Sequence, residues 1–201
     1  IIKTLPDREY LAGIAEVIKC GIIGDSKILK LLKLNRDQIL QRKINEVFEM
    51  CYLTLKTKIK FFINDVYEKD TRLILNFGHT FAHAIEMSIE QKLNRDYIRH
   101  GEAVGIGMLC EIFYEKKKRD HIYNTVESLL KNYNLPVNLI SKNIPFKKID
   151  LINKIYKNIF LDKKRLNKNP RYISIKKFQE AKIKEMDNFN FLNDVIAQVI
   201  K

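Results

Sequence analysis

The chain has 201 residues, enough for one domain with a sizeable hydrophobic core or for two small ones. Hydrophobic residues make up 46% and charged residues 30%, as in a soluble globular protein, and no apolar run approaches the ~20 residues of a membrane helix. The net charge of +13 comes from lysines spread along the whole chain, so it indicates solvated helix faces more than a nucleic-acid surface.

Apolar periodicity and helix-start signals predict a mainly helical chain. In chain order we expect helices over residues 7–20, 26–32, 36 into the 60s, 72–89, 101–119, 122–133, 146–159 and 190–200. In the long third helix, the residues expected to face inward are Ile39, Ile44, Val47, Phe48, Cys51 and Leu55.

The C-terminal region changes character after residue 161. Residues 162–170 look like a loop, and the weakly alternating segments 172–175 and 181–184 predict two short strands. No internal repeat or linker divides the chain, so we expect a single multihelical domain over 1–201 with a small β-hairpin near the C-terminus. The sequence has no G-x-G-x-x-G or P-loop motif, and therefore nothing that would build a dinucleotide site on its own.

The three cysteines, Cys20, Cys51 and Cys110, are isolated and lack C-x-x-C spacing. This pattern argues against a disulfide framework and a thiolate zinc cluster. It indicates a reducing compartment, and we expect a cytoplasmic protein. The chain begins with Ile1 and not with Met, so we also expect that the natural N-terminus lies further upstream.

Three of the four histidines lie between residues 79 and 100. If 72–89 is one helix, Arg72, Asn76, His79 and His83 share a face, because they follow the spacing i, i+4, i+7 and i+11. A face with a cation, an amide and two imidazoles is typical of a polar pocket, and these histidines with His100 and a carboxylate could hold zinc. The residues alone leave open whether both His79 and His83 bind the metal or whether one of them carries protons.

The carboxylate partner is less clear. Glu16 lies among alanine, valine and isoleucine, where a buried carboxylate must be paired or bound to a metal, yet with Lys19 it could form a surface ion pair. Glu68, four residues before Arg72, could be a second acid or only a charge at a helix N-terminus. In a lysine-rich chain there is no separate signal for Lys58, Lys163 or Lys164.

Four blocks of the sequence together resemble the C-terminal domain of 3-dehydroquinate synthase. They are the segment 5–19 (LPDREYLAGIAEVIK), the pattern RxxxNxxHxxxH over 72–83, the run HGEAV over 100–104, and DKK over 162–164. Their order and approximate spacing agree from residue 1 to about residue 165. This family has a Rossmann-like N-terminal NAD domain followed by a mostly helical domain, and the chain resembles only the second.

The resemblance implies a role for each matched residue. The metal ligands, for Zn²⁺ or Co²⁺, would be Glu16, His79 and His100. The proton-transfer residues would be Glu68 and His83. The residues that bind the phosphate, carboxylate and hydroxyls of the substrate would be Lys19, Lys58, Arg72, Asn76 and one of Lys163 and Lys164. The residues next to NAD at the domain junction would be Ile1, Ile2, Lys3 and Thr4.

The implied reaction converts 3-deoxy-D-arabino-heptulosonate 7-phosphate to 3-dehydroquinate and phosphate, in aromatic amino-acid biosynthesis. The resemblance also implies a homodimer when the missing NAD domain is present, with neither nucleic acid nor membrane as a partner. The chain departs from the family at Ala82, where glycine is usual, at Cys20, where tyrosine is frequent, and in a longer gap before His100. None of these departures removes a matched functional residue.

Two other interpretations remain. Another sugar-phosphate cyclase, or a metal-dependent polyol dehydrogenase of the same superfamily, would share most of these blocks. More distantly, a basic helical module could bind nucleic acid, and its affinity would fall steeply with salt.

Overall fold

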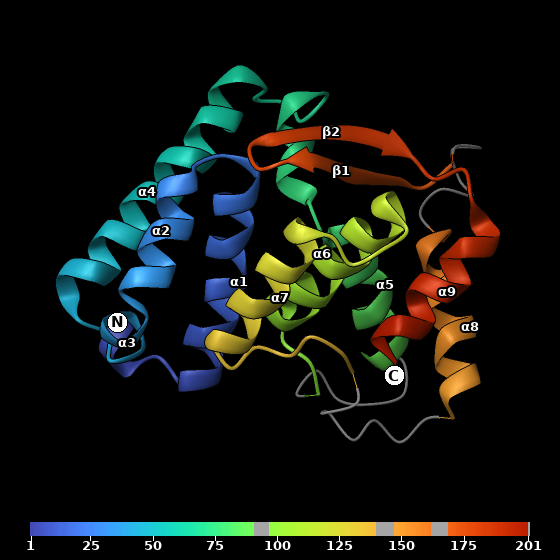
Figure 1. Cartoon of the computed structure of the whole chain (residues 1–201), viewed down its shortest axis with the longest axis horizontal. Helices are drawn as coiled ribbons and strands as arrows, with labels where there is room; N and C mark the ends of the chain where they lie inside the picture. Colours follow the sequence, from blue (N-terminus) through green and yellow to red (C-terminus); the bar gives the residue numbers. More distant parts are fainter. Residues whose placement is uncertain (91–96, 140–146, 162–168, 201) are drawn as a thin grey trace.

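The computed structural model describes residues 1–90, 97–139, 147–161 and 169–200 (Figure 1). The helices of this part are α1 Asp7–Ile23, α2 Ser26–Leu34, α3 Arg36–Leu40, α4 Ile44–Asn64, α5 His79–Glu90, α6 His100–Lys116, α7 His121–Asn132, α8 Lys148–Ile159 and α9 Phe189–Val199, with 3₁₀ helices η1 Ile2–Thr4 and η2 Thr71–Asn76. The strands β1 Arg171–Lys177 and β2 Glu180–Glu185 pair antiparallel. The mainly helical fold with a hairpin near the C-terminus is therefore confirmed.

Helix α6 lies at the centre of the fold. Its residues from Gly101 to Ile112 are all buried, and α1, α5, α7, α9 and β1 all pack against it. Two glycines allow unusually close approach: a Cβ at Gly101 would lie 1.9 Å from the carbonyl oxygen of Ala12 on α1, and a Cβ at Gly107 would lie 2.0 Å from that of Gly78. The start of α6 is thereby drawn against α1, and its middle against the residues that begin α5.

The β-hairpin lies over one end of α1 and α6 (Figure 1). Ile173 is paired with Ile183 in the antiparallel register, and Gln179 in the turn has a positive φ of 62°. The backbone N–H of Gln179 donates to the carbonyl of Ile22 at 2.8 Å, and its side-chain amide donates to Gly21 at 2.9 Å. These bonds fasten the C-terminal hairpin to the last turn of α1.

The prediction of one long helix from residue 36 is wrong. The helix is interrupted at residues 41–43, where Arg42 has φ 57° and donates to the carbonyl of Lys3 and to the carboxylate of Asp7. The expected inward face is also wrong, except at two positions, Ile39 and Val47, which are buried. The residues of that stripe that are exposed instead are Ile44, Phe48, Cys51 and Leu55.

The prediction of a single helix over 72–89 is wrong as well. Residues 71–76 form the 3₁₀ helix η2, Phe77 and Gly78 form a turn in which Gly78 has φ 83°, and α5 begins only at His79. A side chain at Gly78 would meet the carbonyl oxygen of Val104 at 2.8 Å. Arg72 and Asn76 therefore belong to a separate turn in front of the histidine helix.

No helix in the described ranges is both long and apolar enough to cross a membrane. All three cysteines are free thiols; Cys20 and Cys110 are buried and Cys51 is exposed.

Candidate metal and substrate site

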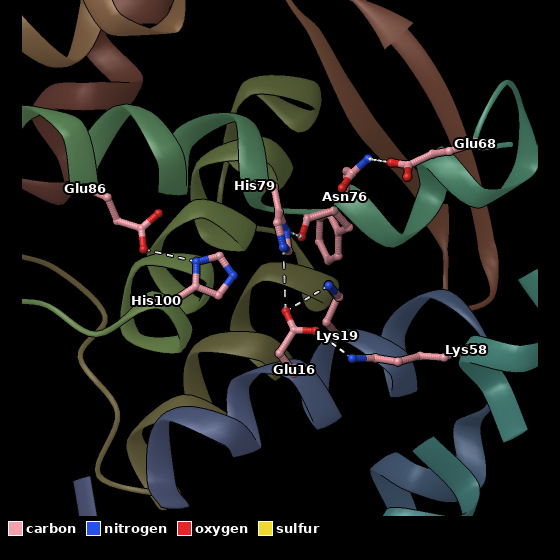
Figure 2. A network of polar contacts seen from close by, with 9 residues as sticks. Glu16, Lys19, Lys58, Glu68, Asn76, His79, Glu86 and His100 are labelled. Atoms are coloured by element: carbon pink, nitrogen blue, oxygen red, sulfur yellow. Dashed lines mark hydrogen bonds and ion pairs between the residues drawn. The ribbon is translucent and has the colours of Figure 1, made fainter. Parts of the chain in front are cut away.

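Glu16 is held on α1 between two lysines (Figure 2). Its Oε1 is 2.8 Å from Nζ of Lys19, and its Oε2 is 3.0 Å from Nζ of Lys58 on α4. Burial by itself would raise the pKa of Glu16, but the charges of the two lysines and their hydrogen bonds outweigh it and lower the pKa to about 2. The Glu16–Lys19 pair exists, yet Lys19 is only 2% exposed, so it is not a surface pair. Glu16 is thus an anion at neutral pH.

His79, the first residue of α5, faces this carboxylate. Its Nδ1 is 3.2 Å from the carbonyl oxygen of Phe77, and its Nε2 is 3.8 Å from Oε1 of Glu16. Since a carbonyl can only accept, Nδ1 carries the proton and Nε2 keeps its lone pair. Burial, together with the charge of Lys19, lowers the pKa of His79 to about 4. His79 is therefore neutral near pH 7, as a metal ligand must be.

His100 is the first residue of α6, and its ring lies close to Glu16 and His79. Its ring centroid lies 5.1 Å from that of His79 and 6.1 Å from that of His83. Its Nδ1 is 3.0 Å from Oε1 of Glu86 on α5, a hydrogen bond that raises the pKa of His100. Because Nδ1 is engaged with this carboxylate, Nε2 is the nitrogen left for a metal, as in carboxylate–histidine–metal arrangements.

Two overlapping groups of donor atoms result. The ligand atoms of Glu16, His79 and His100 all lie within 4.8 Å of one another, and so do those of His83, Glu86 and His100. The first group combines an ionised carboxylate with two imidazoles and leaves one position open, a donor set that suits catalytic zinc. Glu86 was missed in the sequence, although it lies seven residues after His79 and therefore on the same face of α5.

Glu68, Arg72 and Asn76 are gathered in front of α5. The amide Nδ2 of Asn76 donates to Oε1 of Glu68 at 2.9 Å, and Nη2 of Arg72 lies 3.6 Å from Oε2 of Glu68. Nη1 of Arg72 also donates to the carbonyl of Val66 at 2.7 Å. Glu68 itself has a φ of 53°, which fits a tight polar turn. These three residues meet without the continuous helix that the sequence suggested.

A cavity of about 330 Å³ lies beside the donor atoms. The volume suits a small-molecule ligand. Its polar lining comes from the turn at Glu68, from η2, α5 and α8, and from the start of β1, which sequence reasoning had not connected with the site. These lining residues include Glu68, Asn76, His79, His83, Arg171 and Tyr172. Only His79 belongs both to this lining and to the first donor group.

Some expected site residues are not placed in the cavity. Lys163 and Lys164 lie outside the described residues. Residues 1–4 are described: Ile2–Thr4 form η1, and the hydroxyl of Thr4 donates to the carbonyl of Ile1 at 3.0 Å. Their suggested contact with NAD stays a prediction.

The helical fold, with its carboxylate and histidine donors beside a cavity of mixed polar and apolar lining, defines the class as a helical domain suited to bind a metal. The model of the family described as 3-dehydroquinate synthase C-terminal matches residues 13–165. The chain therefore belongs to the 3-dehydroquinate synthase family and corresponds to its C-terminal domain.

Relatives agree with this membership. The chain is 30% identical over 206 residues to 3-dehydroquinate synthase of Thermodesulfovibrio yellowstonii and 32% identical over 209 residues to that of Vesicomyosocius okutanii. Each match covers 99% of the chain but only 52% of the relative. The chain thus spans about half the length of the curated relatives it matches.

Solved structures show the same fold. The chain superposes with a TM-score of 0.76 and 16% identity on 2-epi-5-epi-valiolone synthase from Streptomyces hygroscopicus, solved with NAD⁺ and Zn²⁺ bound. It superposes with a TM-score of 0.74 and 20% identity on a 2-deoxy-scyllo-inosose synthase complexed with carbaglucose-6-phosphate, NAD⁺ and Co²⁺. Both comparisons cover 98% of the chain and little more than half of the larger protein. At these identities they establish the fold and not the substrate.

Proposed function

We propose that the chain is the metal- and substrate-binding half of a 3-dehydroquinate synthase. This lyase converts 3-deoxy-D-arabino-heptulosonate 7-phosphate to 3-dehydroquinate and phosphate in the shikimate pathway. The observation that carries the proposal is the group of donor atoms from Glu16, His79 and His100, next to a cavity with both polar and apolar walls, in a chain of this family. The curated relatives that bear this enzyme name support the same reaction.

The donor group fits a divalent ion such as Zn²⁺ or Co²⁺, held by Glu16, His79 and His100. Glu16 is ionised and His79 is neutral, which are the protonation states that metal binding requires. When bound there, the ion would supply Lewis-acid chemistry toward a substrate hydroxyl, and NAD, carried by the other half of the enzyme, would supply hydride transfer.

Cationic and amide side chains would hold the substrate. Lys19, Lys58 and Arg72 suit the phosphate and carboxylate groups, because guanidinium and ammonium groups form charge-assisted hydrogen bonds to oxyanions. Lys19 and Lys58 already contact Glu16, so they adjoin the metal donors. Asn76 offers its amide to hydroxyls from the cavity wall. We assign one of Lys163 and Lys164 to the same task by family match.

His83 and Glu68 are proposed to move protons. Both line the cavity, and the ring of His83 lies 5.5 Å from that of His79. A neutral imidazole beside the substrate can accept a proton from one group and pass it to another, typically contributing ~100- to 10,000-fold in rate. Glu68 already accepts a hydrogen bond from Asn76, which orients its carboxylate toward the same cavity.

We propose that the remaining half of the relatives' length corresponds to a nucleotide-binding domain that precedes Ile1. Residues 1–4 would then adjoin NAD at the junction, and the 201-residue chain alone would be inactive. The homodimer and the cytoplasmic location implied by the family are part of the same proposal.

The runner-up is a different sugar-phosphate cyclase, because both solved structures above are cyclases with other products. The test is phosphate release by the full-length protein with NAD and zinc, comparing 3-deoxy-D-arabino-heptulosonate 7-phosphate with glucose 6-phosphate. Turnover of only the heptulosonate supports the proposal, and turnover of only glucose 6-phosphate rejects it. Phosphate release by the 201-residue chain without its other half would disprove the role given to the missing domain.

A further inference from the structure

Glu111 is a buried carboxyl group that the proposed site does not use. It lies on α6, its side chain is 0% exposed, and its Oε2 accepts a hydrogen bond from the backbone N–H of Ile173 on β1 at 2.9 Å. Burial raises the pKa of Glu111 to about 8, and the nearby backbone N–H groups of Ile173, Gly78 and Thr80 act in the opposite direction. Its Oε1 has no well-formed hydrogen bond within the described part of the chain. Burying a carboxyl group costs free energy unless it is well paired, so a structural or functional role for Glu111 is expected.

Two of the three N–H groups near Glu111, those of Gly78 and Thr80, lie at the beginning of the histidine helix. The first N–H groups of a helix have no partner inside the helix and carry partial positive charge, so a carboxyl group beside them is favourable. Thr80 also donates its hydroxyl to the carbonyl of Arg171 on β1 at 2.7 Å. Glu111 therefore lies where α5, α6 and β1 meet, and α5 and β1 both contribute residues to the cavity.

The contact lies along one face of α6. Val104, Gly107 and Glu111 follow the spacing i, i+3 and i+7 and share that face. A Cβ at Gly107 would lie 2.0 Å from the carbonyl oxygen of Gly78, and one at Gly78 would lie 2.8 Å from that of Val104. The turn at Gly78 is thus pressed against α6 directly beside Glu111.

This turn also fixes the orientation of the His79 imidazole ring. The carbonyl of Phe77 accepts from Nδ1 of His79 and leaves Nε2 facing Glu16. Any movement of Phe77 or Gly78 would therefore rotate the imidazole away from the donor group. Ligand orientation by such outer partners commonly decides metal affinity.

We propose that Glu111 is a positioning residue whose carboxyl group holds residues 77–80 and β1 against α6 and thereby fixes the orientation of His79. It acts through the backbone and touches neither substrate nor metal. The inference rests on the proposed metal role of His79. A glutamine at this position keeps the shape, but it replaces one carboxyl oxygen beside the N–H groups of Ile173, Gly78 and Thr80 with an N–H donor.

Helix α6 offers a matched control one turn further on. Glu115 contacts the same hairpin, because Tyr172 donates to its Oε2 and Lys184 lies 2.8 Å from its Oε1. None of its contacts in the described residues involves α5. Glu115→Gln therefore disturbs the attachment of the hairpin without touching the start of the histidine helix.

The experiment measures zinc affinity by competition with a chromophoric chelator, together with amide hydrogen exchange of the 77–82 segment without metal. It uses the wild-type chain, Glu111→Gln and Glu115→Gln. We expect Glu111→Gln to weaken zinc binding about tenfold, by analogy with outer-shell partners of metal ligands, and to speed exchange in that segment. Glu115→Gln should stay within about twofold of wild type for zinc and leave the segment unchanged.

Wild-type zinc affinity and wild-type exchange in a folded Glu111→Gln protein would overturn the inference. If Glu111→Gln does not fold, Glu111→Asp, which keeps the carboxyl group but is one methylene shorter, takes its place with the same criteria. A wild-type chain that binds no zinc would reject the proposed metal site instead. In that case, the exchange rates alone decide whether Glu111 holds the turn.

Discussion

Helices α4 and α5 are both rich in apolar residues, yet the fold uses them in opposite ways. On α5, Phe81 is 0% exposed and packs in the core, while His79 and His83 line the cavity. On α4, Phe48 is 70% exposed, and only one narrow stripe, with Val47 and Met50, is buried against the rest of the chain. A helix with a polar functional face therefore has only one face left for the core, whereas a helix apolar on two faces does not reveal which one is buried.

The largest expected difference between these helices is in the cost of removing a phenylalanine ring. Phe81→Ala should lower the free energy of unfolding by about 3–5 kcal/mol, because it empties a fully enclosed site. Phe48→Ala should change it by less than about 0.5 kcal/mol, since its ring is mostly in water. Urea unfolding of both variants, followed by circular dichroism, measures the contrast. A loss of several kcal/mol for Phe48→Ala would mean that the α4 face is packed in solution.

A smaller difference in stability is expected between alanine substitutions at two glycines. Gly107→Ala should destabilise the chain by about 1–3 kcal/mol or more, because the new methyl group meets the carbonyl of Gly78. Gly13→Ala, on the exposed face of α1 with nothing within 4 Å, should stabilise it by about 0.5–1 kcal/mol through helix propensity. Thermal unfolding measures both changes. Equal shifts would show that α5 and α6 are not in the close contact described.

The smallest effect is expected at the hairpin and depends on pH. Burial would raise the pKa of Glu115, but the hydrogen bonds from Lys184 and Tyr172 outweigh it and keep the pKa below the ordinary 4.5. A lowered folded-state pKa stabilises the fold above the unfolded value and loses this contribution as pH falls through the folded value.

Glu115→Gln should therefore cost about 1 kcal/mol at pH 7, and the difference from wild type should shrink as pH falls below 4.5. Urea midpoints between pH 7 and pH 3.5 measure the difference. A cost that is independent of pH would show that the charge of Glu115 is not what holds Lys184 and Tyr172.

The sequence predicted the helical class and the hairpin, because apolar periodicity and strand alternation are local signals. The approach of His79 to His100 was expected from the grouping of the histidines and from the family resemblance. Sequence reasoning missed the breaks at Arg42 and Gly78, which depend on contacts between distant segments. Arg42 is stabilised by Lys3 and Asp7, and Gly78 adopts its positive φ against α6. Glu111 was invisible for the same reason, since its partners lie on α5 and β1 and leave no local pattern.

We propose that Glu16, His79 and His100 hold one metal ion and that His83 does not bind it. A second donor group, formed by His83, Glu86 and His100, could hold the metal instead. The two groups predict different effects of replacing His83, so the proposal can be refuted. A fourth protein ligand would close the coordination sphere and turn a catalytic site into a structural one. His83 must therefore stay free if the cavity is to bind substrate at the metal.

The most direct measurement is the zinc content of the purified wild-type chain, His79→Ala and His83→Ala after loading under identical conditions, by elemental analysis. We expect one equivalent of zinc in wild type and in His83→Ala, and none in His79→Ala. Equal zinc in wild type and His79→Ala, or a His83→Ala protein without zinc, would contradict the proposal.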